Sequence, residues 1–264
     1  MPNIDEIKQL LLQGFSAFEA IVVRPNSAFT KVERERKFVF PVLVTYAAYL
    51  VAYALFYTYK PADFPAEAAQ AGLEKIPVMA WFFTEMLWGT FFTVSWVFFL
   101  SVFDGLASRL SIAKFIPSAF GITAVSAIAL LLFQSGEVTS KLLFGLLFLL
   151  IIGGAWFFTA QKDFPYFRLT LLFILANSVN ILLVLPLMVC TLFRWENGYM
   201  ASQLLWGLWL LVLCTMGVKK LRGLSHARAL LALLFALGMN FLLIFSLFML
   251  GLISKETLKI FFVS

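Results

Sequence analysis

Charged residues in this chain are gathered into short segments that separate long stretches without charge. Only 13% of the 264 residues are charged and 62% are hydrophobic. An α-helix needs about 20 consecutive apolar residues to cross the ~30 Å hydrocarbon core of a bilayer. The sequence holds seven stretches of this kind. It therefore predicts an all-α fold, a polytopic transmembrane helix bundle, and excludes a soluble domain, in which about 25% of residues are charged.

The seven predicted spans form one transmembrane helical domain over residues 38–264. Their approximate limits are 38–59, 78–103, 115–134, 141–160, 166–193, 199–218 and 229–253. The third and fourth spans have an alternative interpretation, in which residues 115–160 form a re-entrant or extra pair. Five spans would then remain, and the two ends of the chain would keep the same orientation.

The segment 1–37 precedes the first span and differs from it in pattern. Apolar residues recur there every three or four positions, namely Ile4, Ile7, Leu11, Phe15, Phe18 and Val22. The faces between them carry polar residues, so the pattern predicts an amphipathic helix over 4–22 that is too polar to span. We expect this segment to lie at the cytoplasmic membrane interface or on a partner.

The distribution of Lys and Arg predicts the orientation of the chain. With seven spans, 14 of the 20 basic residues fall on the side that holds the N-terminus. Basic residues are enriched in cytoplasmic loops, so the N-terminus is predicted to be cytoplasmic and the C-terminus outside. The net charge of +6 follows from these short loops. It is therefore no sign of a nucleic-acid partner.

Residue types that carry catalysis or bind metals are sparse. The only histidine, His226, lies in a basic loop, and the sequence contains no Walker lysine loop and no Cys or His pair with metal-ligand spacing. We therefore expect no enzyme activity, no metal and no cofactor. Cys190 and Cys214 are predicted to lie about 25 Å apart in depth, too far for a disulfide bond.

Polar residues inside the spans are the best candidates for a site, since hydrocarbon penalises them. The candidates are Glu85, Asn177, Asn180, Gln203 and Asn240. One interpretation is hydrogen bonding between helices of the bundle. The other is a polar site that lines a cavity, with Glu85 as a proton or cation acceptor. Asp104 lies at the end of a span, where we expect it to reach water as an ordinary surface carboxylate.

Basic residues on the predicted cytoplasmic side are candidates for contact with lipid or a partner. They are Arg34, Arg36, Lys37, Lys219, Lys220, Arg222 and Arg228. Each basic residue near an anionic membrane surface contributes roughly 1 kcal/mol to binding. Several glycines would allow helices to approach one another closely, among them Gly153, Gly207 and Gly217.

Three segments resemble the YIP (Ypt-interacting protein) domain family of membrane proteins. They are Val23-Arg-Pro-Asn-Ser-Ala-Phe29, residues 167–186, and the stretch from Leu204-Leu-Trp-Gly-Leu-Trp209 through Leu221-Arg-Gly-Leu-Ser225-His-Ala-Arg-Ala229. The resemblance implies about five spans, a cytoplasmic N-terminus and an outside C-terminus. It implies a membrane adaptor without catalytic residues. The long N-terminal region of eukaryotic members has no counterpart in this sequence, so a bacterial inner-membrane member is implied.

Two functional hypotheses follow. The first is an integral membrane scaffold or adaptor that binds lipid and other membrane or peripheral proteins. The alternative is a small transporter or channel subunit with a polar intramembrane site around Glu85, Asn177 and Asn180.

Overall fold

The computed structural model describes residues 39–61, 63–65, 77–134 and 165–253, with isolated positions elsewhere. Within these ranges the secondary structure is α-helical, and no strand occurs among the described residues. The all-α prediction is therefore confirmed. The predicted fourth span (141–160) and the predicted amphipathic helix (4–22) lie outside the continuously described residues, as do Arg34, Arg36 and Lys37.

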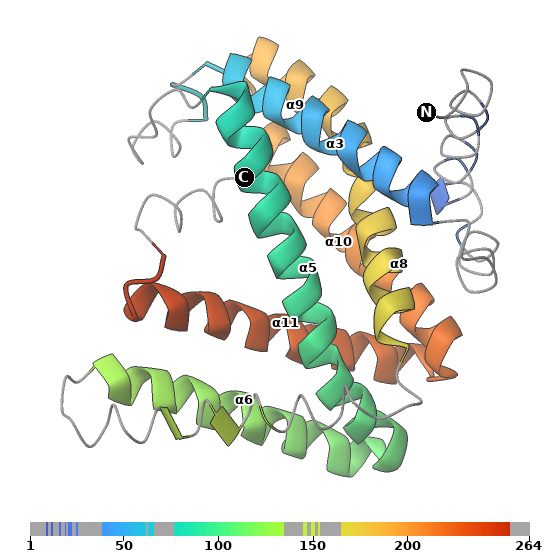
Figure 1. Ribbon diagram of the computed structural model, residues 1–264, viewed down its shortest axis with the longest axis vertical. Helices are drawn as coiled ribbons and strands as arrows, with labels where there is room; N and C mark the ends of the chain where they lie inside the picture. The colour runs from blue at the N-terminus through green and yellow to red at the C-terminus, as the bar shows by residue number, and fades with distance from the viewer. Residues whose placement is uncertain are drawn as a thin grey trace, which may run out of the picture. The chain divides into compact units, whose positions relative to one another are not determined.

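Seven described helices make up the fold (Figure 1). They are α3 (Val39–Tyr59), α5 (Val78–Arg109), α6 (Ile112–Gln134), α8 (Tyr166–Ser178), α9 (Ile181–Leu192), α10 (Glu196–Arg222) and α11 (His226–Met249). Taken together, α8 and α9 match the predicted fifth span. Counted in this way, six helical segments are long and apolar enough to cross a membrane. The chain is thus a multi-pass helical membrane protein. Helix α6, which corresponds to the third predicted span, is long enough to cross the membrane by itself.

The chain divides into two compact units. The first comprises residues up to Thr93 together with Phe167–Leu221, and so contains α3, the first half of α5, α8, α9 and nearly all of α10. The second comprises Val94–Tyr166 and Arg222–Ser264, with the second half of α5, α6 and α11. The long helix α5 contributes to both.

In the first unit, α3 packs against α9. The helices α8 and α10 approach closely at Gly217, because a Cβ atom placed there would lie 2.6 Å from the Leu172 side chain. The expectation of close packing is therefore confirmed for Gly217. It is wrong for Gly207, where a Cβ atom would meet no other atom of the described residues within 4 Å, and the stretch around Gly153 lies outside the continuously described residues.

The span formed by α8 and α9 is broken in its middle. In this stretch the backbone turns more tightly, because four N–H groups donate to the carbonyl three residues earlier, namely those of Val179, Asn180, Leu182 and Leu183. Pro186 lies one turn into α9, where it lacks an N–H group and its ring crowds the preceding turn. The tighter turn accordingly places Asn177 and Asn180 at an interruption in an otherwise apolar span.

In the second unit, α6 lies alongside α11 (Figure 1). Aromatic rings hold these helices to α5, because Phe235 of α11 stacks on Phe103 at 5.7 Å and meets Phe115 edge-on at 6.1 Å. Ser225 caps the start of α11 by accepting a hydrogen bond from the Arg228 N–H.

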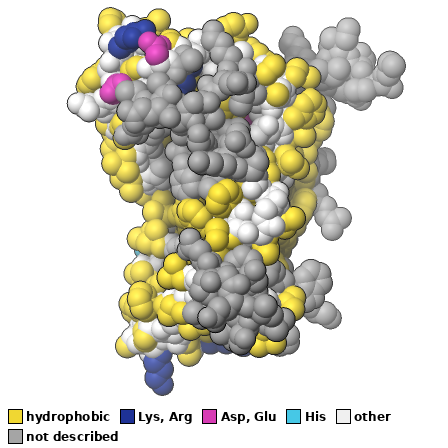
Figure 2. Space-filling view, turned by 90° about the vertical axis from the view of Figure 1, so that its left-hand side faces the viewer, with side chains coloured by type: hydrophobic (Ala, Val, Ile, Leu, Met, Phe, Trp, Pro, Cys, Tyr) yellow, Lys and Arg dark blue, Asp and Glu magenta, His cyan; other side chains and the backbone are white. Residues whose placement is uncertain are grey.

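Large apolar side chains cover much of the exposed surface (Figure 2). On α6 they include Phe120 and Leu131, which are 65% and 66% exposed. A monomeric soluble protein rarely shows so extensive an apolar surface, whereas a bilayer covers it. Both cysteines are buried and free, so the prediction that they form no disulfide bond is confirmed.

Candidate functional site: a tyrosine ladder in the first unit

One face of α3 is lined with tyrosine. Tyr46, Tyr49, Tyr53 and Tyr57 are spaced by three or four residues, which places them on the same side of the helix. Each is between 5% and 8% exposed. Four hydroxyl groups are therefore carried into the interior of the first unit along a single helix.

The rings of these tyrosines follow one another closely. Successive ring centroids lie 5.9, 5.3 and 4.7 Å apart from Tyr46 to Tyr57. The hydroxyl oxygens of Tyr53 and Tyr57 are 3.1 Å apart, and the Tyr57 hydroxyl lies 3.5 Å from that of Tyr199 on α10. We call these five residues the tyrosine ladder.

Lys60 lies at one end of the tyrosine ladder. Its ammonium is 4.8 Å from the ring centroid of Tyr57 and 5.5 Å from that of Tyr199. Burial lowers the pKa of Lys60 to about 8. The two aromatic faces act in the opposite sense, because they attract the protonated form. A cation that is half-buried and open to exchange with water therefore lies over the end of the ladder.

Glu85 of α5 faces the tyrosine ladder from the side. It is half-buried, and its carboxyl group is close enough to Tyr46, Tyr49 and Tyr53 to act on them electrostatically. One turn further along α5, a Cβ atom on Gly89 would lie 3.0 Å from the Tyr46 hydroxyl oxygen. The absence of a side chain at Gly89 thus allows Tyr46 to reach α5.

The polar contacts continue to the break between α8 and α9. Asn177 donates from Nδ2 to Thr93 Oγ1 at 3.0 Å, and Thr93 donates to the Gly89 carbonyl at 2.8 Å. Asn180 lies within hydrogen-bonding reach of Tyr49, while its own Oδ1 is buried and finds no partner among the described residues. The sequence-based candidates Glu85, Asn177 and Asn180 therefore lie around one polar face.

The tyrosine ladder extends through a large part of the bilayer thickness. Lys60 follows Tyr46 by 14 positions, which corresponds to about 21 Å of helix, against a hydrocarbon core of ~30 Å. Among the described residues, no group of three His, Cys, Asp or Glu side chains could hold a metal ion. The chemistry available is that of hydroxyl, amide, carboxyl and ammonium groups.

The other candidate residues lie elsewhere. Asn240 belongs to the second unit, where its Oδ1 accepts a hydrogen bond from Ser95 at 2.6 Å. Gln203 is half-buried on α10. Lys219 and Lys220 are exposed at the end of α10, and Arg228 is half-buried in the first turn of α11.

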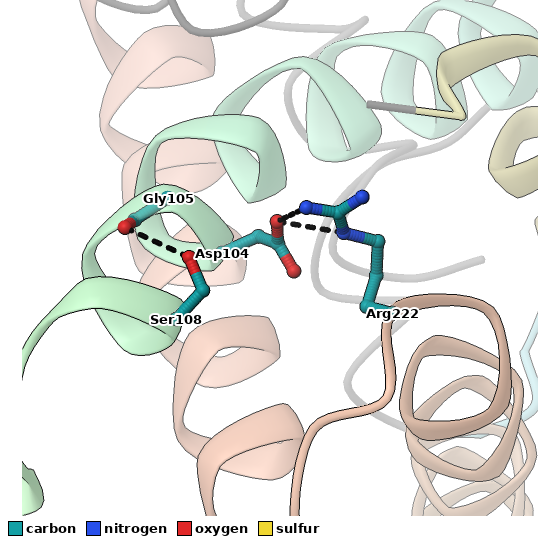
Figure 3. Close-up of polar contacts among 4 residues, drawn as sticks. All are labelled: Asp104, Gly105, Ser108 and Arg222. Carbon is teal, nitrogen blue, oxygen red and sulfur yellow. Dashed lines mark hydrogen bonds and ion pairs between the residues drawn. The ribbon is translucent and has the colours of Figure 1, made fainter. Parts of the chain in front are cut away.

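Asp104 corrects a prediction made from the sequence. It was expected to reach water, but it is only 1% exposed and pairs with Arg222 at 2.8 Å through Nη2 and 2.9 Å through Nε (Figure 3). Both contacts involve Oδ2, and Oδ1 is buried and has no partner in the part of the chain that the structure describes. Arg222, expected to face lipid or a partner, is instead held against the end of α5. The prediction failed because α5 continues to Arg109, beyond the predicted end of the span, and because Arg222 at the end of α10 pairs with Asp104.

The tyrosine ladder was missed from the sequence because tyrosine was treated as an apolar residue of a span. The available signal was its spacing: tyrosines recur at three- or four-residue intervals along α3, although the chain has only seven in total. Comparison of the chain with protein-family models, with curated protein sequences and with solved structures finds no match.

Removing one partner of the Asp104–Arg222 pair is predicted to destabilise the protein strongly. Asp104→Ala leaves the largely buried guanidinium of Arg222 without its counter-charge, and such changes cost about 3–5 kcal/mol. Unfolding of the purified protein in mixed detergent micelles measures this loss. The exposed pair between Asp63 and Arg194 is the control, since Asp63→Ala should cost less than about 1 kcal/mol.

The double variant Asp104→Leu/Arg222→Met refines this prediction. It removes both charges, so it should be more stable than Asp104→Ala alone. Equal losses for Asp104→Ala and Asp63→Ala would show that the buried pair has no special role.

Proposed function

We propose that this protein is a small transporter or channel subunit that moves an ion through the polar site at Glu85 in the first unit. The observation that carries the proposal is a carboxyl group on a candidate span, that of Glu85, close enough to a row of buried tyrosines to act on them electrostatically. A carboxylate at the centre of a membrane helix costs about 2.5–3.5 kcal/mol on insertion scales. Such residues face protein or water and commonly mark ion pathways.

The choice of tyrosine over phenylalanine supports the proposal. The chain contains 31 phenylalanines and only seven tyrosines, and five of these tyrosines belong to the tyrosine ladder. Phenylalanine fills the same volume without bringing a hydroxyl group into hydrocarbon, where an unpaired polar group is costly. Packing alone therefore favours phenylalanine at these positions, whereas a polar path requires the hydroxyl groups.

The interrupted span formed by α8 and α9 gives a second line of support. Transporters often form their sites at membrane helices broken near the midplane, where freed polar groups contact the ion. Here the break brings Asn177 to Thr93 and Asn180 to Tyr49. Both contacts extend the polar face of which Glu85 is a part.

Glu85→Gln is predicted to reduce transport in proteoliposomes. The amide keeps the shape of the side chain but cannot carry a negative charge or exchange a proton. We expect ion flux to fall at least about tenfold, equivalent to ~1.4 kcal/mol in the barrier. Fluxes of protons, Na⁺ and K⁺ are measured separately with ion-sensitive dyes inside the vesicles.

Glu196→Gln is the matched control for Glu85→Gln. Glu196 is an exposed carboxylate in the first turn of α10, so its loss should leave the flux unchanged. Wild-type protein that carries none of the three ions, or equal effects of the two variants, would contradict the proposed function.

A second candidate function is the adaptor role that the YIP-like segments imply. Its support is the exposed position of Lys219 and Lys220 at the end of α10, beside the connection to α11. In this interpretation the N-terminus is cytoplasmic, the membrane is a bacterial inner membrane, and these lysines bind anionic lipid or an acidic partner.

Lys219→Gln/Lys220→Gln tests the adaptor function. The change should weaken binding of the protein, held in nanodiscs, to phosphatidylglycerol vesicles by roughly 1 kcal/mol per lysine. Arg194→Gln, a basic residue at the connection between α9 and α10, is the control and should have no effect. Unchanged binding of the double variant would reject this candidate.

A further inference from the structure

We infer that the ion carried by the site is the proton, and that Tyr57 and Tyr53 connect Lys60 with Glu85. This inference rests on the proposed function and assigns its substrate. It follows from three features of the first unit: the contact between hydroxyl groups, the close packing around them, and the position of Lys60 at the end of the row.

The hydroxyl contacts have the geometry of a proton relay. The oxygens of Tyr53 and Tyr57 are 3.1 Å apart, and either of them can be the donor. A phenol hydroxyl both donates and accepts a hydrogen bond. The pair can therefore reverse its direction without moving its rings. Tyr199, whose oxygen lies 3.5 Å from that of Tyr57, positions the Tyr57 hydroxyl from α10.

The packing favours a proton over any larger ion. The rings of the tyrosine ladder follow one another at centroid distances of 4.7–5.9 Å, and their side chains are nearly excluded from solvent. Hard metal cations such as Ca²⁺ take about 6–8 oxygen ligands, whereas Glu85 supplies one carboxyl group. Within the described residues Glu85 belongs to no group of three His, Cys, Asp or Glu side chains that could hold a metal ion. A proton needs only the chain of hydroxyl oxygens.

Lys60 provides the exchange with water. It is half-buried beside the ring of Tyr57, and burial lowers its pKa to about 8, so both its forms are populated near neutral pH. Its ammonium lies over the rings of both Tyr57 and Tyr199, next to the end of the hydroxyl row.

The transfer balances as a concerted shift of protons. The Tyr53 hydroxyl gives its proton to the Glu85 carboxylate and receives the proton of Tyr57. Tyr57 receives a proton from the Lys60 ammonium, and the neutral amine takes one from water. Each tyrosine gives and gains one proton and stays neutral. The net result is one proton moved from water to Glu85.

Tyr53→Phe and Tyr57→Phe test the relay directly. Each removes one hydroxyl group and keeps the ring and its packing. Proton flux into proteoliposomes, followed with a trapped pH-sensitive dye, should fall at least about tenfold in either variant. Tyr59→Phe is the matched control on the same helix, since Tyr59 is 78% exposed and outside the row. It should behave as wild type.

The possible failures are distinguishable. If the wild type carries no proton, Na⁺ or K⁺ flux, the proposed function fails and the relay fails with it. If Glu85→Gln abolishes Na⁺ or K⁺ flux and no proton flux exists, the function stands and the relay is wrong. Proton flux in Tyr53→Phe and Tyr57→Phe equal to that of Tyr59→Phe also overturns the relay. Thermal unfolding identifies a variant that has lost its fold. In that case the wild type provides an independent test of the relay, because its proton flux should be slower in D₂O than in H₂O.

Discussion

Hydrocarbon offers no partner for a polar group, and this constraint governs the first unit. Backbone groups satisfy it by forming helices, but polar side chains must find partners on neighbouring helices. The face of α3 bears four buried tyrosines, so the helices around it must supply oxygen, nitrogen or cationic groups. They do so through Tyr199 on α10, Asn180 beside α9, and Glu85 on α5. The polar face thus determines which side of each neighbour turns inward.

The second unit obeys the same constraint with different chemistry. Ser95 pairs with Asn240, and the indole N–H of Trp96 donates to the Leu233 carbonyl at 3.2 Å. Nearly three helical turns beyond the middle of α5, Asp104 pairs with Arg222. Each of these contacts joins two helices. The first unit instead carries a row of buried tyrosines on one helix face with Glu85 beside it, which is why we assign the proposed transport to the first unit.

Much of the fold could be predicted from the sequence, because span length and charge placement are local properties. The limits of α3 and α11 agree with the predicted spans to within a few residues. Contacts between distant segments could not be predicted. Asp104 and Arg222 are 118 residues apart in the sequence, and only the folded chain shows that they form an ion pair. Glu85 and Asn180 could be singled out from the sequence as polar residues within apolar spans. The tyrosines around them were not, because hydropathy does not distinguish a ring packed for its shape from one placed for its hydroxyl group.

The central claim is that Glu85 exchanges protons with water through the tyrosine ladder. Infrared difference spectroscopy of the protein in oriented membranes, recorded across a pH jump, tests it most directly. The account predicts a carboxyl band and tyrosine ring bands that change together. Both changes should be lost in Glu85→Gln, and the carboxyl change should slow in Tyr57→Phe. A carboxyl band that does not respond to bulk pH, or one that responds at the same rate without the Tyr57 hydroxyl, would contradict the account.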